Sequence, residues 1–82
     1  MKMRAYLDLL VAEGKSIGEF AERAHLSDSM VYLIANETRN ASLMAAFDIE
    51  HASDGAITAE ELPLKERSRR LLVKIRAREK TR

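Results

Sequence analysis

The stretch from Ser16 to Arg39, SIGEFAERAHLSDSMVYLIANETR, constrains the fold of this chain more strongly than any other. Apolar residues recur at three- and four-residue intervals from Ile17 to Ala24, and this spacing predicts a short helix with one buried face. Ser16, with Glu19 three residues later, forms a capping box at the start of that helix.

A second short helix, Ser27 to Ala35, follows a break at His25-Leu26. Ser27 supplies its N-cap, and Asp28 places an acid in the first turn, where the helix dipole favours one. Three apolar residues of this helix are expected to point inward: Met30, Val31 and Ile34. Two short helices separated by a tight break indicate a helix-turn-helix motif. The second helix carries polar groups on its outer face, and the motif therefore suggests DNA binding.

The motif resembles the helix-turn-helix of the Cro and repressor family, without a gap. The matching positions are Ser16, Phe20, Ala21, Leu26, Ser27, Ser29, Val31, Ile34, Asn36 and Arg39. Three positions depart from the family pattern. Ile17 replaces a phosphate-binding Gln, His25 replaces the turn Gly and Glu37 replaces the Gly after Asn36. His25 would have to adopt the left-handed backbone region, which His accepts more readily than most residues.

The later stretch AFDIEHASDGAITAEEL, residues 46 to 62, resembles the C-terminal half of small Cro-like and YdaS-like phage or prophage regulators. The matching positions are Ala46, Ile49, Glu50, Ala52, Gly55, Ile57, Thr58, Glu61 and Leu62. With the motif, the resemblance covers about residues 4 to 64. It implies a compact, all-α, lambda-repressor-like domain of four to five helices.

The remaining residues also predict helices, and no strand-like alternation persists. A first helix is expected from Met3 to Glu13, ended by Gly14, with Met3, Tyr6, Leu7, Leu10 and Val11 on its buried face. A fourth is expected from Ala41 or Ser42 to Ser53. Thr58 and Glu61 form a second capping box in a short final turn.

Charge divides the chain into an acidic domain, residues 1–64, and a basic tail, residues 65–82. The first part holds five Lys or Arg and eleven Asp or Glu, whereas the second holds nine basic and two acidic residues. Long-range attraction to DNA would therefore come mainly from the tail or from a local patch.

The tail is expected to form a basic amphipathic helix. Its apolar stripe is Leu64, Leu71, Leu72 and Ile75, with Ser68 between them; its electrostatic residues are Arg67, Arg69, Arg70, Lys74, Arg76 and Arg78. The stripe would dock on the acidic domain or on a second subunit, or the tail would follow the DNA backbone and fold on contact. The tail would alternatively be a solvated chain end without a partner. The hypothesis that it binds a membrane surface is less well supported, because the stripe lacks Trp and Phe.

The sequence excludes several other classes. Cysteine is absent, and no apolar run approaches the ~20 residues of a membrane span, so we expect a cytoplasmic protein without a disulfide. We expect no enzyme, cofactor or small-molecule substrate, because no nucleophile-base-acid set or phosphate loop is present. We also expect no metal site: His25 and His51 lack a second ligand, and a calcium loop starting at Glu50 would place Ala52 at a ligand position.

Roles in DNA binding follow from the geometry of the motif, whose second helix lies in the major groove. Base contacts are assigned to Asp28, Ser29 and Tyr32, and phosphate contacts to Ser16, Ser27, Asn36, Thr38, Arg39 and Asn40. Alternatives stay open at several positions: Ser16, Ser27 and Asp28 would also serve as caps alone, and Tyr32 as a surface residue or protein contact. Leu33, expected to be exposed, would touch a thymine methyl group or a protein.

The predicted function is sequence-specific transcriptional regulation of phage or prophage type, as a repressor that binds double-stranded DNA as a homodimer. The alternative is a helix-turn-helix fold used as a protein-interaction module, such as an antitoxin or an inhibitor of a host factor. The acidic domain, Ile17 in place of Gln, and Leu33 suggest this alternative.

Overall fold

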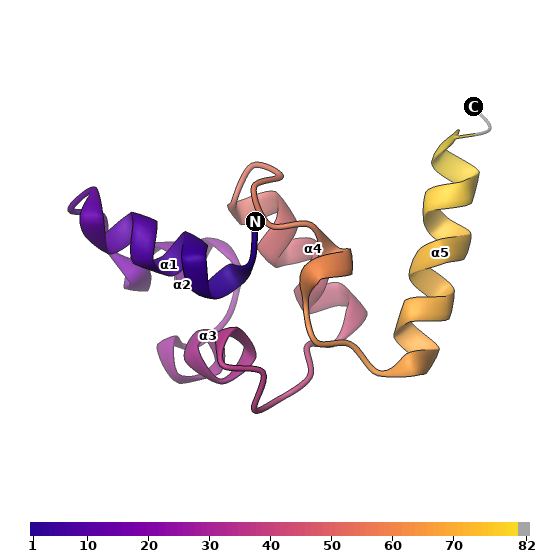
Figure 1. The fold of residues 1–82 in the computed structure, drawn as a ribbon, viewed down its shortest axis with the longest axis horizontal. Coiled ribbons are helices and arrows are strands. Elements are labelled where there is room, and N and C mark those ends of the chain that lie inside the picture. The colour runs from indigo at the N-terminus through magenta and orange to yellow at the C-terminus, as the bar shows by residue number, and fades with distance from the viewer. Residues whose placement is uncertain (81–82) are drawn as a thin grey trace.

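The computed structural model describes residues 1–80, which form five α-helices and one short 3-10 helix (Figure 1). The elements are α1 Met3–Ala12, α2 Ile17–Arg23, α3 Asp28–Ala35, α4 Leu43–Ala52, η1 Ala59–Glu61 and α5 Glu66–Lys80. These residues contain no strand, so the all-α prediction is confirmed for this part of the chain. No helix among them is long and apolar enough to cross a membrane.

Serine side chains begin three of the helices. The hydroxyls of Ser16, Ser27 and Ser42 each accept a hydrogen bond from the backbone N–H three residues later, at 3.3, 3.1 and 3.1 Å. Each bond satisfies one of the amide groups that a helix leaves unpaired at its start. The predicted starts of the second, third and fourth helices are therefore confirmed.

The first four helices all end in the same way, with a residue in the left-handed region two positions beyond the helix. These residues are Gly14 (φ 73°), His25 (φ 58°), Glu37 (φ 58°) and Asp54 (φ 52°). After each of them, the next backbone N–H reaches back to the last turn, as from Leu26 to the Ala21 carbonyl at 2.9 Å. This is the Schellman arrangement, in which the left-handed residue is usually glycine.

The core is assembled around α2, which packs against α1, α3 and α4. Phe20 of α2 is fully buried, and its ring lies 5.3 Å from that of Tyr6 in α1, centre to centre. The predicted inward residues Met3, Leu7 and Leu10 are buried. Val11 is 62% exposed, so its expected place on the buried face of α1 is wrong. It lies at the edge of the apolar stripe, and the other described elements leave most of its surface uncovered.

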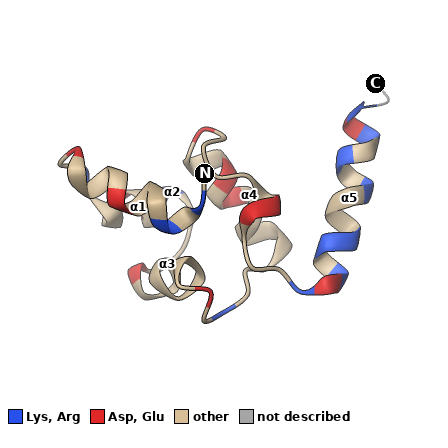
Figure 2. Ribbon diagram, in the orientation of Figure 1, with Lys and Arg blue, Asp and Glu red and all other residues tan. Residues whose placement is uncertain are grey.

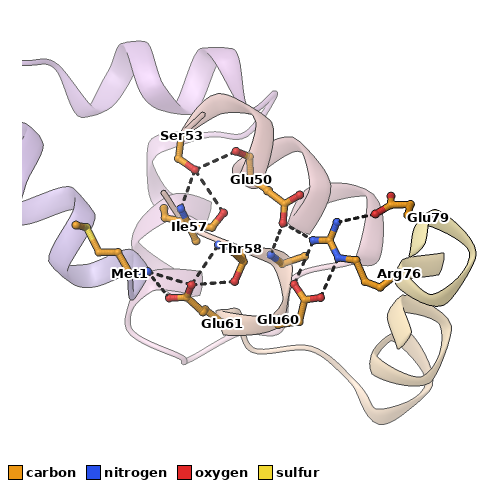
Figure 3. A network of polar contacts seen from close by, with 10 residues as sticks. Met1, Glu50, Ser53, Ile57, Thr58, Glu60, Glu61, Arg76 and Glu79 are labelled. Carbon is orange, nitrogen blue, oxygen red and sulfur yellow. Dashed lines mark hydrogen bonds and ion pairs between the residues drawn. The ribbon is translucent and has the colours of Figure 1, made fainter. Parts of the chain in front are cut away.

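The stretch between α4 and η1 is held by polar side chains (Figure 3). The buried Ser53 hydroxyl accepts from the Ile57 backbone N–H at 3.0 Å and donates to the Glu50 carbonyl at 3.0 Å. The Glu61 carboxylate accepts from the Thr58 hydroxyl at 2.8 Å, within the predicted capping box. These bonds stabilise the turn against which α5 packs.

Helix α5 stands at one side of the molecule, against η1 (Figure 1). Leu72 is 2% exposed and is the buried residue of this helix. Leu71 is 50% exposed, so within this chain the predicted stripe docks through Leu72 and not through Leu71. Adjacent residues point about 100° apart on a helix, and in α5 it is Leu72 that faces the body of the molecule, residues 1–64. The predicted tail helix is confirmed, while residues 81–82 lie outside the described part of the chain.

Candidate nucleic-acid interface

Helix α3 has a buried face and an exposed polar face. Val31 and Ile34 are fully buried, whereas Asp28, Ser29 and Tyr32 are exposed, Tyr32 by 41%. The three residues predicted to contact bases therefore lie on the solvent side of α3. The expectation that Leu33 is exposed is wrong, because this residue is half-buried. The outer face of α3 is consequently more polar than the sequence indicated.

The first turns of α2 and α3 lie close together. A methyl group in place of the Gly18 hydrogen would lie 3.3 Å from the Ser16 hydroxyl oxygen and 3.8 Å from a carboxylate oxygen of Asp28. Both residues are exposed. Ser16, predicted to contact phosphate, and Asp28, predicted to contact a base, thus belong to one small surface around Gly18. A larger residue than Gly18 would crowd this surface.

The loop after α3 carries the remaining predicted phosphate contacts, Asn36, Thr38, Arg39 and Asn40, and all four are exposed. Arg4 of α1 donates from Nη1 to Oδ1 of Asn36 at 3.2 Å. The Asn36 side-chain oxygen is therefore engaged, which leaves its NH₂ group to donate to an anion. This orientation suits a phosphate contact.

Sequence reasoning missed several polar residues beside this loop. Arg4 is brought to the end of α3 by its bond to Asn36. Asn40 lines a hollow together with Ser42, with Lys65, which directly precedes α5, and with Ser68 in the first turn of α5. These residues are far apart in the sequence, and no local pattern relates them. The loop and the start of α5 share a surface because the fold brings Asn40 next to the basic tail.

Charge is distributed unevenly over the molecule (Figure 2). Helix α3 carries Asp28 at its start, the loop after it carries Glu37 and Arg39, and basic residues follow the length of α5. The surface around α3 thus presents hydrogen-bonding groups with little net positive charge. Strong attraction to a polyanion would come from α5.

The tail cations divide into two sets. Arg69 and Arg76 face the body: Arg69 donates to the backbone carbonyls of Glu60 and Leu62 at 3.1 and 2.9 Å. Arg76 forms ion pairs with Glu50, Glu60 and Glu79 (Figure 3). The other described cations of the tail are exposed: Lys65, Arg67, Arg70, Lys74, Arg78 and Lys80. Arg69 and Arg76 thus bind the acidic domain, which is one of the two docking partners predicted for the tail.

Arg76 is the centre of the contact between α5 and the body. It is 26% exposed, and its guanidinium lies 5.6 Å from the centre of the Phe47 ring. Its hydrogen bonds hold the pKa of the Glu60 carboxyl below its ordinary value. The N-terminal ammonium lowers the pKa of Glu61 in the same way, through a 2.7 Å ion pair.

Both histidines are exposed, His25 at the turn before α3 and His51 near the end of α4. Within residues 1–80, no group of three or more His, Asp or Glu side chains is placed to hold a metal ion. Glu50, considered as the start of a calcium loop, instead accepts from the Ala59 backbone N–H at 2.9 Å and pairs with Arg76. Its carboxylate is a structural group.

The chain matches no protein-family model, and the comparisons with curated proteins and with solved structures likewise return no match.

Proposed function

We propose that this chain is a sequence-specific DNA-binding transcriptional regulator of phage or prophage type, built on a lambda-repressor-like helix-turn-helix. The α2–α3 pair is the motif, and α3 enters the major groove. One observation carries the proposal: α3 buries Val31 and Ile34 completely while it presents Asp28, Ser29 and Tyr32 to solvent. Such a helix, anchored along one side and polar along the other, suits insertion into a groove.

The roles within the interface follow from the chemistry of each group. Ser29 and Tyr32 offer hydroxyls to base edges, and Asp28 is an acceptor for the amino group of cytosine. Arg39, Thr38 and the Asn36 amide lie on the loop beyond α3, where they would donate to phosphate oxygens and set the position of the helix. The proposed regulator acts as a repressor and as a homodimer at a partly palindromic site.

Selection from a random pool of DNA duplexes tests the proposal. The full chain is expected to enrich one sequence, with related half-sites about 10 base pairs apart, centre to centre, if it binds as a dimer. Arg39→Ala should weaken binding to all sequences and lower the salt slope by about 0.9, because one phosphate contact is lost. Arg23→Ala is the control, since Arg23 is exposed at the far end of α2.

A second candidate is a protein-interaction module, such as an antitoxin or an inhibitor of a host factor. The observation that favours it is the scarcity of positive charge around α3, where Asp28 and Glu37 lie close to the predicted contacts. Under this alternative the selection enriches no sequence, and Arg39→Ala leaves binding to the protein partner unchanged.

A further inference from the structure

The exposed cations of α5 form a row that the fold turns away from the body. Arg67, Arg70 and Lys74 recur at three- and four-residue intervals and are exposed, and Arg78 continues the row one turn later. Leu72 and Arg76, which face the body, lie on the opposite side of the helix. Arg67, Arg70 and Lys74 therefore point away from the carboxylates of residues 1–64, and Arg70 pairs with Glu66 of its own helix at 2.9 Å.

The start of α5 lies beside the loop that follows α3. Lys65 and Ser68 line one hollow with Asn40 and Ser42, so the start of α5 and the loop share a surface. Figure 1 shows the loop between α3 and α4 at the same lower edge of the molecule as the first turn of α5. A polyanion that reached the loop would have the first turns of α5 beside it.

We infer that α5 is a docked arm whose outer row, Arg67, Arg70 and Lys74, binds the DNA phosphate backbone next to the site met by α3, without preference for base sequence. The inference rests on the proposed function, because duplex DNA is the polyanion that the neighbouring α3 would bring to this edge. Charge complementarity selects this partner: residues 1–64 carry net negative charge, so the outer row supplies the main sequence-independent attraction.

Because α5 is docked, it is already folded before it meets DNA. Arg69 and Arg76 hold α5 to the body through carbonyl and carboxylate partners, and Leu72 is buried there. The cations of the helix are thus held in a fixed row. A phosphate contact through such a row avoids the ordering cost that a disordered basic tail would incur.

A salt titration with two charge-matched double variants of the full chain tests the inference. Arg67→Gln with Lys74→Gln removes two outer cations, while Lys15→Gln with Arg23→Gln removes two cations at the junction of α1 and α2 and the end of α2. Gln has a helix propensity close to those of Lys and Arg, and all four side chains are exposed. Circular dichroism checks that both variants fold.

Binding is measured by fluorescence anisotropy to a random-sequence duplex and to the duplex enriched by selection. The outer variant should lower the slope of log K against log salt by roughly 1 to 2 on both duplexes, since each lost phosphate contact contributes about 0.9. The ratio of the two affinities should stay within about twofold, and the control variant should retain the slope of the parent chain.

The possible results separate the inference from the proposed function. An unchanged slope in the outer variant overturns the inference even if the enriched duplex is still preferred, and it would direct the search for the partner of α5 to an acidic protein. A changed affinity ratio also overturns it, because α5 would then contribute to base preference. A lowered slope with no enriched sequence supports the phosphate contact while the proposed function fails.

Discussion

Replacement of Glu37 by glycine should stabilise the protein. Glu37 ends α3 in the left-handed region at φ 58°, and its side chain is exposed. A side chain with a Cβ atom costs about 1–2 kcal/mol in this conformation. Glycine avoids that cost, but its greater freedom in the unfolded chain lowers stability by about 0.5–1 kcal/mol. The free energy of unfolding of Glu37→Gly should therefore rise by roughly 0.5–1 kcal/mol.

Thermal and urea unfolding measure this change. For a domain of this size, the expected gain corresponds to a rise in Tm of about 2–8 °C. Glu37→Ala is the matched control: it removes the same carboxylate but keeps the Cβ, so its stability should stay within about 0.5 kcal/mol of the parent chain. If Glu37→Gly is no more stable than Glu37→Ala, the conformational strain inferred at the end of α3 is absent and the reasoning is refuted.

Three further predictions concern the packing around η1, and two of them use a comparison substitution elsewhere. Leu72→Ala should lower the free energy of unfolding by about 2–4 kcal/mol because it leaves a cavity under α5. Leu71→Ala, on the exposed side of the helix, should change this free energy by less than about 0.5 kcal/mol. Equal effects of the two substitutions would contradict the docking of α5. Ser53→Ala should lower the free energy of unfolding, measured with urea, by about 1–3 kcal/mol because the Ile57 N–H loses its buried acceptor. Ser42→Ala, which removes the N-cap of α4, is the substitution with which this loss of stability is compared. Because the pKa of Glu60 is lowered in the folded chain, its contribution to stability should be present above about pH 4.5 and lost as the pH falls through the lowered pKa. The difference in stability between the parent chain and Glu60→Gln should accordingly shrink from pH 6 to pH 3, and a constant difference would argue against the ion pair with Arg76.

The helix boundaries could be predicted because caps are local. Ser16, Ser27 and Ser42 each bond an amide only three residues away, so the capping residue and its partner lie within one short segment of sequence. The left-handed backbone at His25 was expected from the family resemblance, because His25 stands where the family has its turn Gly. The exposed polar face of α3 follows from its helical period.

Burial at the edges of the apolar stripes could not be predicted in this way. Val11 and Leu71 both continue an apolar pattern, yet both are exposed, whereas Leu72 beside Leu71 is buried. Helical spacing defines the direction of each side chain, but whether anything covers it depends on a neighbouring element. For α5 that neighbour is η1, a short turn whose position is decided by the packing of the body.

The sequence by itself determined the helices, the capped α2–α3 pair and the separation of an acidic body from a basic tail, because these depend on nearest neighbours or on composition. The tertiary structure decided which tail cations are committed to the body. Arg76 reaches Glu60 and Glu50 across sixteen and twenty-six residues of sequence. The sequence does not distinguish the cations of the tail from one another, and only the docking of α5 through Leu72 separates those that contact residues 1–64, Arg69 and Arg76, from the outward row.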